Sequence, residues 1–348
     1  MPLTDFRTLG RSGLVVSPAA LGTMTFGTKG WGSPDDISQA VFNGYVDAGG
    51  NFIDTADIYS GGRSEELLGG YVADRSLRDK LVLATKFSFN AEAGNPHAGG
   101  NGRKNIHRAL EGSLRRLRTD YVDLYWMHAY DAVTPVEEVL QSLGDLVRAG
   151  KIRYFGFSDL PAWYAVKAAT LAAAHSVPGP IALQMEYSLV ERGIEHEHVP
   201  AARECGMGIM PWSPLAGGFL TGKYQRDGAA GQGRLSGSNP FSGPYSKFTE
   251  RNWSVLDALQ KVAAEVGRLP AQVALAWAAA QPGVTTLLLG ASKLDQLHDN
   301  LAALDLSLTA EQMRALDQGS MSGQASIYGL FKPEGSRMIF GGVGVQGW

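Results

Sequence analysis

The chain has 348 residues, 44% hydrophobic and 19% charged, which is enough apolar material for a large core and excludes a mainly disordered chain. Its 31 basic and 34 acidic residues give a formal charge of −3, so nothing favours a nucleic acid or an anionic membrane as partner. The N-terminal residues lack the layout of a secretory signal, and no run reaches the roughly 20 apolar residues of a membrane span. We therefore expect a soluble, cytoplasmic protein in which Cys205, the single cysteine, is packed and not catalytic.

The chain opens with residues 4–16, which predict a hairpin turning at Arg11-Ser12-Gly13 and suited to plug the bottom of a barrel. Short β-branched or aromatic runs then alternate with helical patterns. The predicted strands are 19–24, 51–56, 81–86, 123–128, 154–159, 181–186, 208–213 and 285–290. The predicted helices are 35–49, 63–73, 103–118, 135–149, 161–175, 195–205, 252–266, 270–280 and 293–302.

This alternation predicts parallel strands joined by crossover helices. A doubly wound open sheet is the alternative, but the GxGxxG turn of such folds does not follow the first strand. We therefore predict one α/β domain over residues 1–348, a (β/α)8 TIM barrel. A Gly/Ser/Pro-rich insertion at 213–249 follows the seventh strand, and a tail covers 319–348. The tail either lies across the barrel opening or extends over the surface.

Polar residues gather where the predicted strands end, which is where the loops of a barrel build its active site. Asp54 ends the second strand, Lys86 the third and His128 the fourth. A lysine directly after the apolar run LVLAT should be buried, and burial of its charge requires a partner such as Asp54. Tyr59, in the loop after Asp54, would then lie beside the ammonium, which lowers the pKa of a phenol toward working pH. His128 would complete the group as a neutral donor to a carbonyl oxygen.

Each of these residues has a structural alternative when taken singly. Asp54 and Lys86 could form an ion pair that serves stability alone, and His128 could be a core histidine with satisfied hydrogen bonds. Tyr59 could cap its loop. Their joint placement at adjacent strand ends favours a catalytic group.

These residues lie in segments that resemble the aldo-keto reductase family. The matching segments are NFIDTADIYSGGRSEELLG, LATKF, YVDLYWMHAYD, KIRYFGFSD, LQMEYSLVER, PWSPLAGGFLTGKY and LLLGASKLDQLHDNL, in the family's order over about residues 6–318. Their style is similar to the bacterial aryl-alcohol-dehydrogenase-like branch. The resemblance implies a carbonyl reductase in which Tyr59 is the acid/base, Lys86 and Asp54 tune it, and His128 orients the carbonyl.

The resemblance further implies an NADPH/NADP+ site. Ser158, Asp159 and Gln184 would bind the nicotinamide carboxamide, and Trp212 would stack on its ring. Other implied contacts are Gly22 and Thr23 at the ribose, Ser213, Leu215, Gly217 and Lys223 at the pyrophosphate, and Gly290, Ala291, Ser292, Lys293, Gln296 and Asn300 at the adenosine 2′-phosphate and adenine. Lys293 at a helix start suits a phosphate and favours NADPH over NADH. The 213–249 insertion becomes a candidate clamp over the cofactor.

Two departures from the family pattern concern this site. Asp159 stands where asparagine is usual, and a carboxylate accepts but cannot donate, so Gln184 or Ser158 must donate to the carboxamide oxygen. Trp212 stands where tyrosine is commoner.

The substrate is expected to be an aryl aldehyde or a bulky alicyclic ketone, because the candidate pocket residues are apolar or aromatic. They are Met24, Phe26, Trp31, Tyr59, Phe87, Trp126 and Tyr130, with Tyr328 and Phe331 if the tail covers the opening. No metal is expected. Two other functions stay open: a slow or non-catalytic NADPH-binding redox regulator, and a lyase using Lys86 as a Schiff base, which pairing with Asp54 disfavours. Oligomeric state is not predicted.

Overall fold

The computed structural model describes residues 2–28, 30, 32–226, 233–235, 247–321, 323, 325–331 and 333–345. Its centre is a sheet of eight parallel strands in the order β10-β3-β4-β5-β6-β7-β8-β9. The strands are β3 (Ala19–Gly22), β4 (Phe52–Asp54), β5 (Val82–Phe87), β6 (Val122–Met127), β7 (Ile152–Ser158), β8 (Ala182–Glu186), β9 (Gly208–Trp212) and β10 (Leu287–Gly290). All eight lie within one or two residues of the predicted runs.

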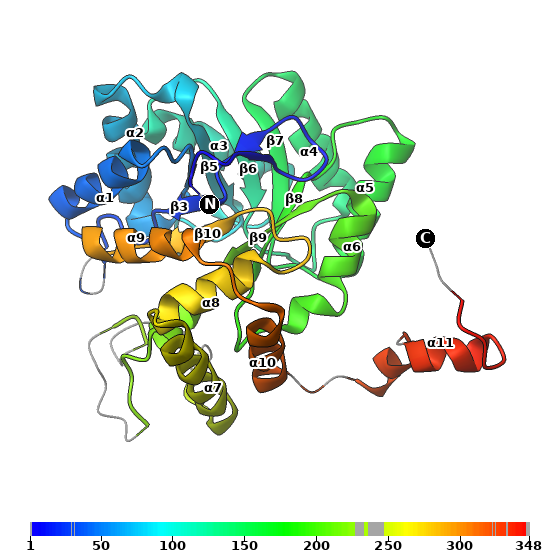
Figure 1. The fold of residues 1–348 in the computed structure, drawn as a ribbon. Helices are drawn as coiled ribbons and strands as arrows, with labels where there is room; N and C mark the ends of the chain where they lie inside the picture. The colour runs from blue at the N-terminus through cyan, green and yellow to red at the C-terminus, as the bar shows by residue number, and fades with distance from the viewer. Residues whose placement is uncertain are drawn as a thin grey trace.

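The sheet curves into a ring that backbone hydrogen bonds close between β9 and the residues just before β10. Ile209 N donates to Gly283 O at 3.0 Å, and Thr285 N donates to Ile209 O at 2.8 Å. On the other side of the closure, Leu287 of β10 pairs with Ala19 of β3. The predicted (β/α)8 barrel is confirmed (Figure 1).

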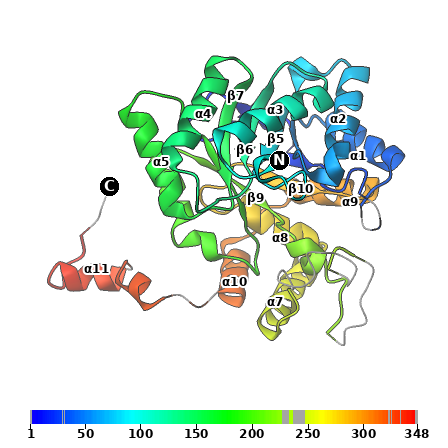
Figure 2. The ribbon, with the colours of Figure 1, turned by 180° about the vertical axis from the view of Figure 1, so that it is seen from behind.

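Helices surround the ring in both views (Figures 1 and 2). They are α1 (Asp35–Asp47), α2 (Arg63–Asp74), α3 (Arg103–Leu117), α4 (Val136–Arg148), α5 (Ala162–Ala174), α6 (His198–Cys205), α7 (Glu250–Val266), α8 (Pro270–Ala279) and α9 (Leu294–Leu301). Each corresponds to a predicted helix. Two further helices, α10 (Ala310–Ser320) and α11 (Pro333–Ile339), were not expected from the sequence.

Side chains of each strand alternate between two apolar layers. Val82, Ala84 and Trp126 belong to the cluster inside the ring, whereas Leu83 and Tyr125 belong to the cluster between the sheet and the helices. The inner layer is tightly packed at Gly156 of β7, where an added Cβ would lie 2.4 Å from the Trp126 ring. The strands therefore enclose a filled core, and a ligand can only bind at an end of the ring.

The predicted hairpin plug is present at the end where the strands begin. Strands β1 (Arg7–Thr8) and β2 (Val15–Val16) are antiparallel, with Arg7 opposite Val16. Leu9, Leu14 and Val16 join the inner cluster. Gly10 packs so closely beneath β8 that a Cβ there would lie 2.3 Å from Ile181 O. This end of the ring is closed, which leaves the C-terminal edge for function.

The C-terminal tail does not lie across the barrel opening, which was one of its two predicted placements. Helix α11 is separated from the barrel helices in both views (Figures 1 and 2). Tyr328, in the 3-10 turn Ser326–Phe331, donates a hydrogen bond to Glu197 and stacks on His196 at 5.0 Å, and Phe331 is 71% exposed. Neither side chain reaches the catalytic residues described below. Among the helices of the described residues, none has both the length and the apolar composition needed to cross a bilayer.

Candidate active site

Three neighbouring strands bring the predicted catalytic residues to the C-terminal edge of the barrel. Asp54 ends β4, Lys86 lies near the end of β5, and His128 follows β6. The ammonium of Lys86 donates to the Asp54 carboxylate, to Thr55 O at 2.8 Å and to the Tyr59 hydroxyl at 3.2 Å. Asp54 and Lys86 are fully buried, while Tyr59 is half-buried. The four residues are therefore brought together as one group.

The loop that carries Tyr59 is held in place by its own backbone turn. Ser60 and Gly61 adopt left-handed conformations, with φ of 51° and 65°. The Ser60 hydroxyl donates to Phe26 O at 2.9 Å and lies 2.7 Å from the Thr28 hydroxyl. These contacts tie the loop to the segment after β3, so the phenol of Tyr59 is aimed back over Lys86.

The charge on Lys86 is retained despite burial. Burial lowers the pKa of a lysine, but here Asp54 and Tyr59 outweigh that effect and raise the pKa of Lys86 above its ordinary value. A permanently charged lysine is a poor amine nucleophile, which disfavours the lyase alternative.

For Tyr59 the direction of the pKa shift corrects the expectation from sequence. Burial is the largest influence and raises the pKa of Tyr59, and Asp54 adds to it, while Lys86 opposes both. The net shift is upward, so the nearby ammonium does not bring the phenol toward neutral pH. Tyr59 stays protonated, which suits a group that gives a proton and makes its phenolate rare.

His128 is neutral, as expected. Burial, with Lys86 as a second cause, holds the pKa of His128 well below its ordinary value. Its ring packs edge-on against Tyr59 at 5.8 Å and Phe89 at 4.8 Å. The hydroxyl of Ser88 accepts a hydrogen bond from His128 N at 3.1 Å and so fixes the histidine backbone. Within the described residues Nδ1 of His128 is buried without a hydrogen-bond partner.

At the ends of β7, β8 and β9 lie the residues predicted to hold a carboxamide. Ser158 pairs in register with Gln184, and its buried hydroxyl has no hydrogen-bond partner among the described residues. The side-chain nitrogen of Gln184 donates to Asp54 at 3.1 Å and contacts Met210 Sδ at 3.5 Å. Gln184 is thus committed as a donor, and Ser158 is left as the group able to donate to a ligand oxygen.

The side chain of Asp159 binds another side chain of the protein, which its residue type alone does not predict. Its Oδ1 accepts a hydrogen bond from the indole Nε1 of Trp212 at 2.9 Å. Partial loss of hydration raises the pKa of Asp159 to about 6; this hydrogen bond opposes the shift and Glu186 adds to it. The indole of Trp212 is half-buried, and no other aromatic ring of the described chain packs on it. A buried hydroxyl without a partner at the end of β7 and a half-buried indole at the end of β9 are suited to a planar ring that bears a carboxamide.

The turn after β9 carries the residues predicted at the pyrophosphate, and its backbone N–H groups bond within the turn. Gly217 and Gly218 adopt φ of 66° and 89°, and Gly217 N donates to Ser213 Oγ at 2.9 Å. Lys223 lies 5.2 Å above the Tyr224 ring, and burial lowers the pKa of its ammonium. Leu215 precedes the 3-10 turn η5 (Ala216–Thr221). Residues 227–232 and 236–246 of the predicted clamp lie outside the described residues.

Sequence reasoning missed Arg234, which belongs to that same insertion. It is half-buried, and its Nη2 lies 3.7 Å from Met24 Sδ. Burial lowers the pKa of the Arg234 guanidinium, whereas Tyr59 and Glu186 oppose that shift. The insertion thus brings a second cation, after Lys223, toward the C-terminal edge. No local pattern singles out one arginine in a long Gly-rich segment.

The residues predicted at the adenosine end surround the start of α9. Gln296 Oε1 accepts from Ser292 N at 2.9 Å and from Ser292 Oγ at 3.1 Å, and Asn300 Nδ2 donates to Gly290 O at 3.4 Å. Lys293 precedes the helix and is exposed. The strand residue Gly22 is buried, and Thr23 is fully buried with its hydroxyl donating to Asp54 O at 3.1 Å, so the Thr23 side chain is occupied by the protein.

Three of the predicted substrate contacts need correction because their side chains are fully buried. Phe26 and Phe87 lie in the outer layer, and Trp126 lies inside the ring. Strand alternation explains Phe87 and Trp126: Lys86 points inward, so its neighbour Phe87 points outward, and Trp126 lies one layer below His128. Tyr130 is half-buried against Trp163 and Tyr164, and its place in the pocket stays a prediction. Met24 stays at the edge beside Arg234, and Trp31 lies outside the described residues.

Phe89 was not predicted as a pocket residue, yet it lies beside His128. Its side chain is 45% exposed, and its ring contacts the histidine edge-on. Between β5 and Phe89, Ser88 has a φ of 122°, which breaks the strand alternation and turns Phe89 back toward the edge.

Comparison with known proteins accords with this geometry. A family model described as the aldo/keto reductase family matches residues 19–320. This chain belongs to the aldo/keto reductase family.

Relatives of this aldo/keto reductase include an uncharacterized oxidoreductase of Bacillus subtilis (strain 168), 36% identical over 90% of this chain and 95% of its own. A probable voltage-gated potassium channel subunit beta of Oryza sativa subsp. japonica is 35% identical over 87% of this chain and 92% of its own. An aryl-alcohol dehydrogenase [NADP(+)] of Phanerodontia chrysosporium is 35% identical over 92% of this chain and 86% of its own. The chain is therefore an NAD(P)-dependent oxidoreductase, and its family supports carbonyl reduction with a nicotinamide cofactor.

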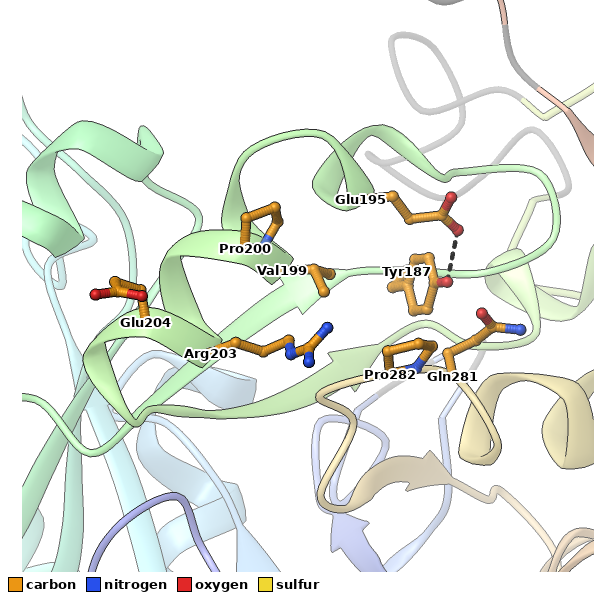
Figure 3. Close-up of a pocket in the computed structure, with 8 residues that line it drawn as sticks. All are labelled: Tyr187, Glu195, Val199, Pro200, Arg203, Glu204, Gln281 and Pro282. Carbon is orange, nitrogen blue, oxygen red and sulfur yellow. Dashed lines mark hydrogen bonds between the residues drawn. The ribbon is translucent and has the colours of Figure 1, made fainter. Parts of the chain in front are cut away.

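A pocket among the described residues lies away from the catalytic group. It has a volume of about 730 Å³ and is lined by Tyr187, Glu195, Val199, Pro200, Arg203, Glu204, Gln281 and Pro282 (Figure 3). Glu195 is already occupied there, accepting from Tyr187 at 2.6 Å and from Arg192 at 2.7 Å. None of the four catalytic candidates contributes to this pocket, so we do not assign the reductase reaction to it. No His/Cys/Asp/Glu cluster suited to a metal occurs among the described residues.

Proposed function

We propose that this enzyme reduces an aldehyde or ketone to the alcohol with NADPH, reversibly, and that Tyr59 is the general acid. The observation that carries the proposal is the triple contact of the buried Lys86 ammonium with Asp54, Thr55 O and Tyr59. It holds a protonated phenol at the C-terminal edge, beside the neutral ring of His128. When bound, the reduced nicotinamide supplies the hydride.

In this proposal His128 donates a hydrogen bond to the carbonyl oxygen, and Tyr59 transfers its proton to that oxygen as the negative charge develops. Lys86 then stabilises the phenolate that remains, and Asp54 keeps the lysine charged and correctly aimed. The proton lost by Tyr59 is regained from solvent, since the side chain is half-buried and not sealed.

Cofactor binding is assigned to the residues at the ends of β7 to β10. Ser158 would donate to the carboxamide oxygen and Trp212 would supply the stacking face, in keeping with the unpartnered Ser158 hydroxyl. Gly217, Lys223 and Arg234 would bind the pyrophosphate. Lys293 at the exposed start of α9 would favour the 2′-phosphate and hence NADPH over NADH.

The substrate class rests on fewer observations. Phe89 and Met24 offer apolar surface beside His128 and Arg234, which suits an aryl aldehyde or a bulky alicyclic ketone. The relative named as an aryl-alcohol dehydrogenase supports the first of these.

The test is the Tyr59→Phe variant, assayed with a panel of aldehydes and ketones by NADPH absorbance. We expect turnover to fall by about 10²- to 10⁴-fold, while NADPH binding, followed by fluorescence titration, stays near that of the unaltered enzyme. Turnover retained by the variant would remove Tyr59 from the mechanism.

A second candidate function is a slow, NADPH-binding redox-sensing subunit, favoured by the relative named as a potassium channel subunit beta. The two functions differ in steady-state rate. Ordinary turnover of simple carbonyl substrates without any protein partner supports the enzyme, and turnover that requires a partner supports the regulator.

A further inference from the structure

The side chains of Asp159 and Trp212 link two strand ends across a third. Asp159 directly follows β7, Trp212 ends β9, and β8 lies between these strands in the sheet. The hydrogen bond from the indole Nε1 to Asp159 Oδ1 measures 2.9 Å. An N–H bond lies in the plane of the indole, so this hydrogen bond restricts rotation of the ring and does not itself cover the ring face.

The backbone has left-handed conformations at Asp159 and directly after Trp212. Asp159 adopts a φ of 46°, and Ser213, directly after Trp212, adopts a φ of 53°. Left-handed conformations of residues other than glycine are uncommon and need support from their surroundings. At Asp159 that support includes Tyr130 N, which donates to Asp159 O at 3.1 Å. Both strand ends are thereby turned toward each other.

The charges around Asp159 leave its carboxylate only partly compensated. Glu186 of β8 is a second carboxylate nearby, but Lys247 forms an ion pair with it at 2.8 Å. Lys86 of β5 also faces Asp159, yet its ammonium already binds Asp54. The partner of Asp159 is the neutral indole N–H, and no ion pair of Asp159 occurs among the described residues, so an uncompensated carboxylate lies at the edge of the indole.

That charge distinguishes the two redox forms of a nicotinamide. The oxidised ring carries a formal positive charge and the reduced ring is neutral, while the carboxamide, ribose and phosphates are the same in both. We propose that Asp159 fixes the indole plane of Trp212 and that its carboxylate makes the oxidised form of the cofactor bind more tightly than the reduced form. This inference rests on the proposed nicotinamide site, and Asp159 acts in it as a positioning and selectivity residue.

The test compares dissociation constants of NADP+ and NADPH for the unaltered enzyme, Asp159→Asn and Asp159→Leu. Asparagine keeps an oxygen that accepts from Trp212 but carries no charge, whereas leucine removes the acceptor as well. In Asp159→Asn we expect NADP+ binding to weaken about three- to tenfold, as for the loss of one partly solvated charge, with NADPH binding nearly unchanged. In Asp159→Leu we expect both forms to bind more weakly, because the indole is released.

The pH dependence of the same ratio gives a second readout. Since the pKa of Asp159 is about 6, the preference of the unaltered enzyme for NADP+ should shrink from pH 8 to pH 5.5. Asp159→Asn should show no such change. Titration of the 2′-phosphate near pH 6 affects both cofactor forms equally and cancels in the ratio. Glu186→Gln is the matched control, and its ratio should change less because Lys247 compensates that charge.

The measured dissociation constants distinguish failure of the charge selectivity from failure of the proposed nicotinamide site. Equal weakening of NADP+ and NADPH in Asp159→Asn, or an unchanged ratio, would overturn the charge selectivity. If neither form binds the unaltered enzyme, the proposed nicotinamide site is wrong. A selective loss of NADP+ binding supports the inference whether or not Tyr59 proves to be the acid, because the measurement does not depend on turnover.

Discussion

The ammonium of Lys86 and the carboxylate of Asp54 form an ion pair from which solvent is excluded, since both side chains are fully buried. Burying such a pair costs several kcal/mol per ion in desolvation. The attraction between the charges and further hydrogen bonds must offset that cost. Here Thr55 O, Tyr59 and Gln184 satisfy the remaining donors and acceptors of the pair. The pair thus holds the ammonium of Lys86 in a fixed position beside the Tyr59 hydroxyl, more than it adds to stability.

Removing the charge of Lys86 alone should therefore lower the free energy of unfolding more than removing the charges of Lys86 and Asp54 together. Lys86→Met leaves Asp54 buried and unpaired, and we expect the free energy of unfolding to fall by about 3–5 kcal/mol. The double variant Lys86→Met/Asp54→Asn should recover most of this loss, because asparagine is neutral and still accepts from Gln184. Denaturant unfolding measures both. Turnover should stay low in the two variants, and a double variant no more stable than the single one would contradict this account.

The pH profile of reduction follows from two opposite pKa shifts. The pKa of Tyr59 is raised, so its proton-donating form persists to higher pH than for an ordinary tyrosine. The pKa of His128 is lowered, so it stays neutral well into the acid range. We expect kcat/KM for reduction to be level between about pH 6 and pH 9 and to fall only near or above pH 10. A drop centred near pH 7 would show that another group controls the proton step.

Asp57 gives a prediction about stability and pH. Its carboxyl is 6% exposed, and within the described residues Oδ1 has no hydrogen-bond partner. Burial, aided by Glu65, raises the pKa of Asp57 to about 7. The folded protein thus holds a proton there that the unfolded chain releases near pH 4, so this group lowers the free energy of unfolding as pH rises from about 4 to 7.

We therefore expect Asp57→Asn to raise the free energy of unfolding at pH 8 by about 1–4 kcal/mol and to change it little at pH 4.5. Urea unfolding at the two pH values measures the difference. The exposed Asp79→Asn is the matched control and should be neutral. A stabilisation of equal size at both pH values would mean that packing, and not the charge, is responsible.

Arg234 is expected to contribute to cofactor affinity. Arg234→Ala should weaken NADPH binding about tenfold, and the loss should diminish as salt rises, because screening reduces the contribution of the guanidinium in the unaltered enzyme. Fluorescence titration at two ionic strengths checks both statements. Lys104→Ala, an exposed lysine on α3, should leave the affinity unchanged. An unaltered affinity in Arg234→Ala would show that the guanidinium does not contribute to cofactor binding.

The barrel could be predicted from sequence because each strand and helix carries its own local pattern. The eight predicted strands were sufficient to place Asp54, Lys86 and His128 at one edge, since parallel strands bring their carboxyl ends together. The direction of the Tyr59 pKa shift could not be predicted in the same way. It depends on how much protein surrounds the phenol, and burial outweighed the adjacent ammonium.

Other errors have particular causes. The aromatic side chain of Phe87 suits a substrate pocket by residue type, but alternation from Lys86 places it on the opposite face of the sheet. Helix α10 lies beyond the last predicted helix, 293–302, although Thr309 and Gln312 form a capping box at its start, which is a local sign of a helix. The bond between Asp159 and Trp212 joins residues 53 positions apart, and no local pattern reports such a contact.

The pairing of β3 with β10 has a consequence for how the protein is made. Ala19 leaves the ribosome early, yet its partner Leu287 is translated about 270 residues later. At a synthesis rate of about 5–20 residues per second, roughly 13 to 54 s pass between the synthesis of β3 and that of β10, with which it pairs. During that interval its edge is open to pairing with other chains, so the nascent protein should depend on chaperones until its last strand has emerged.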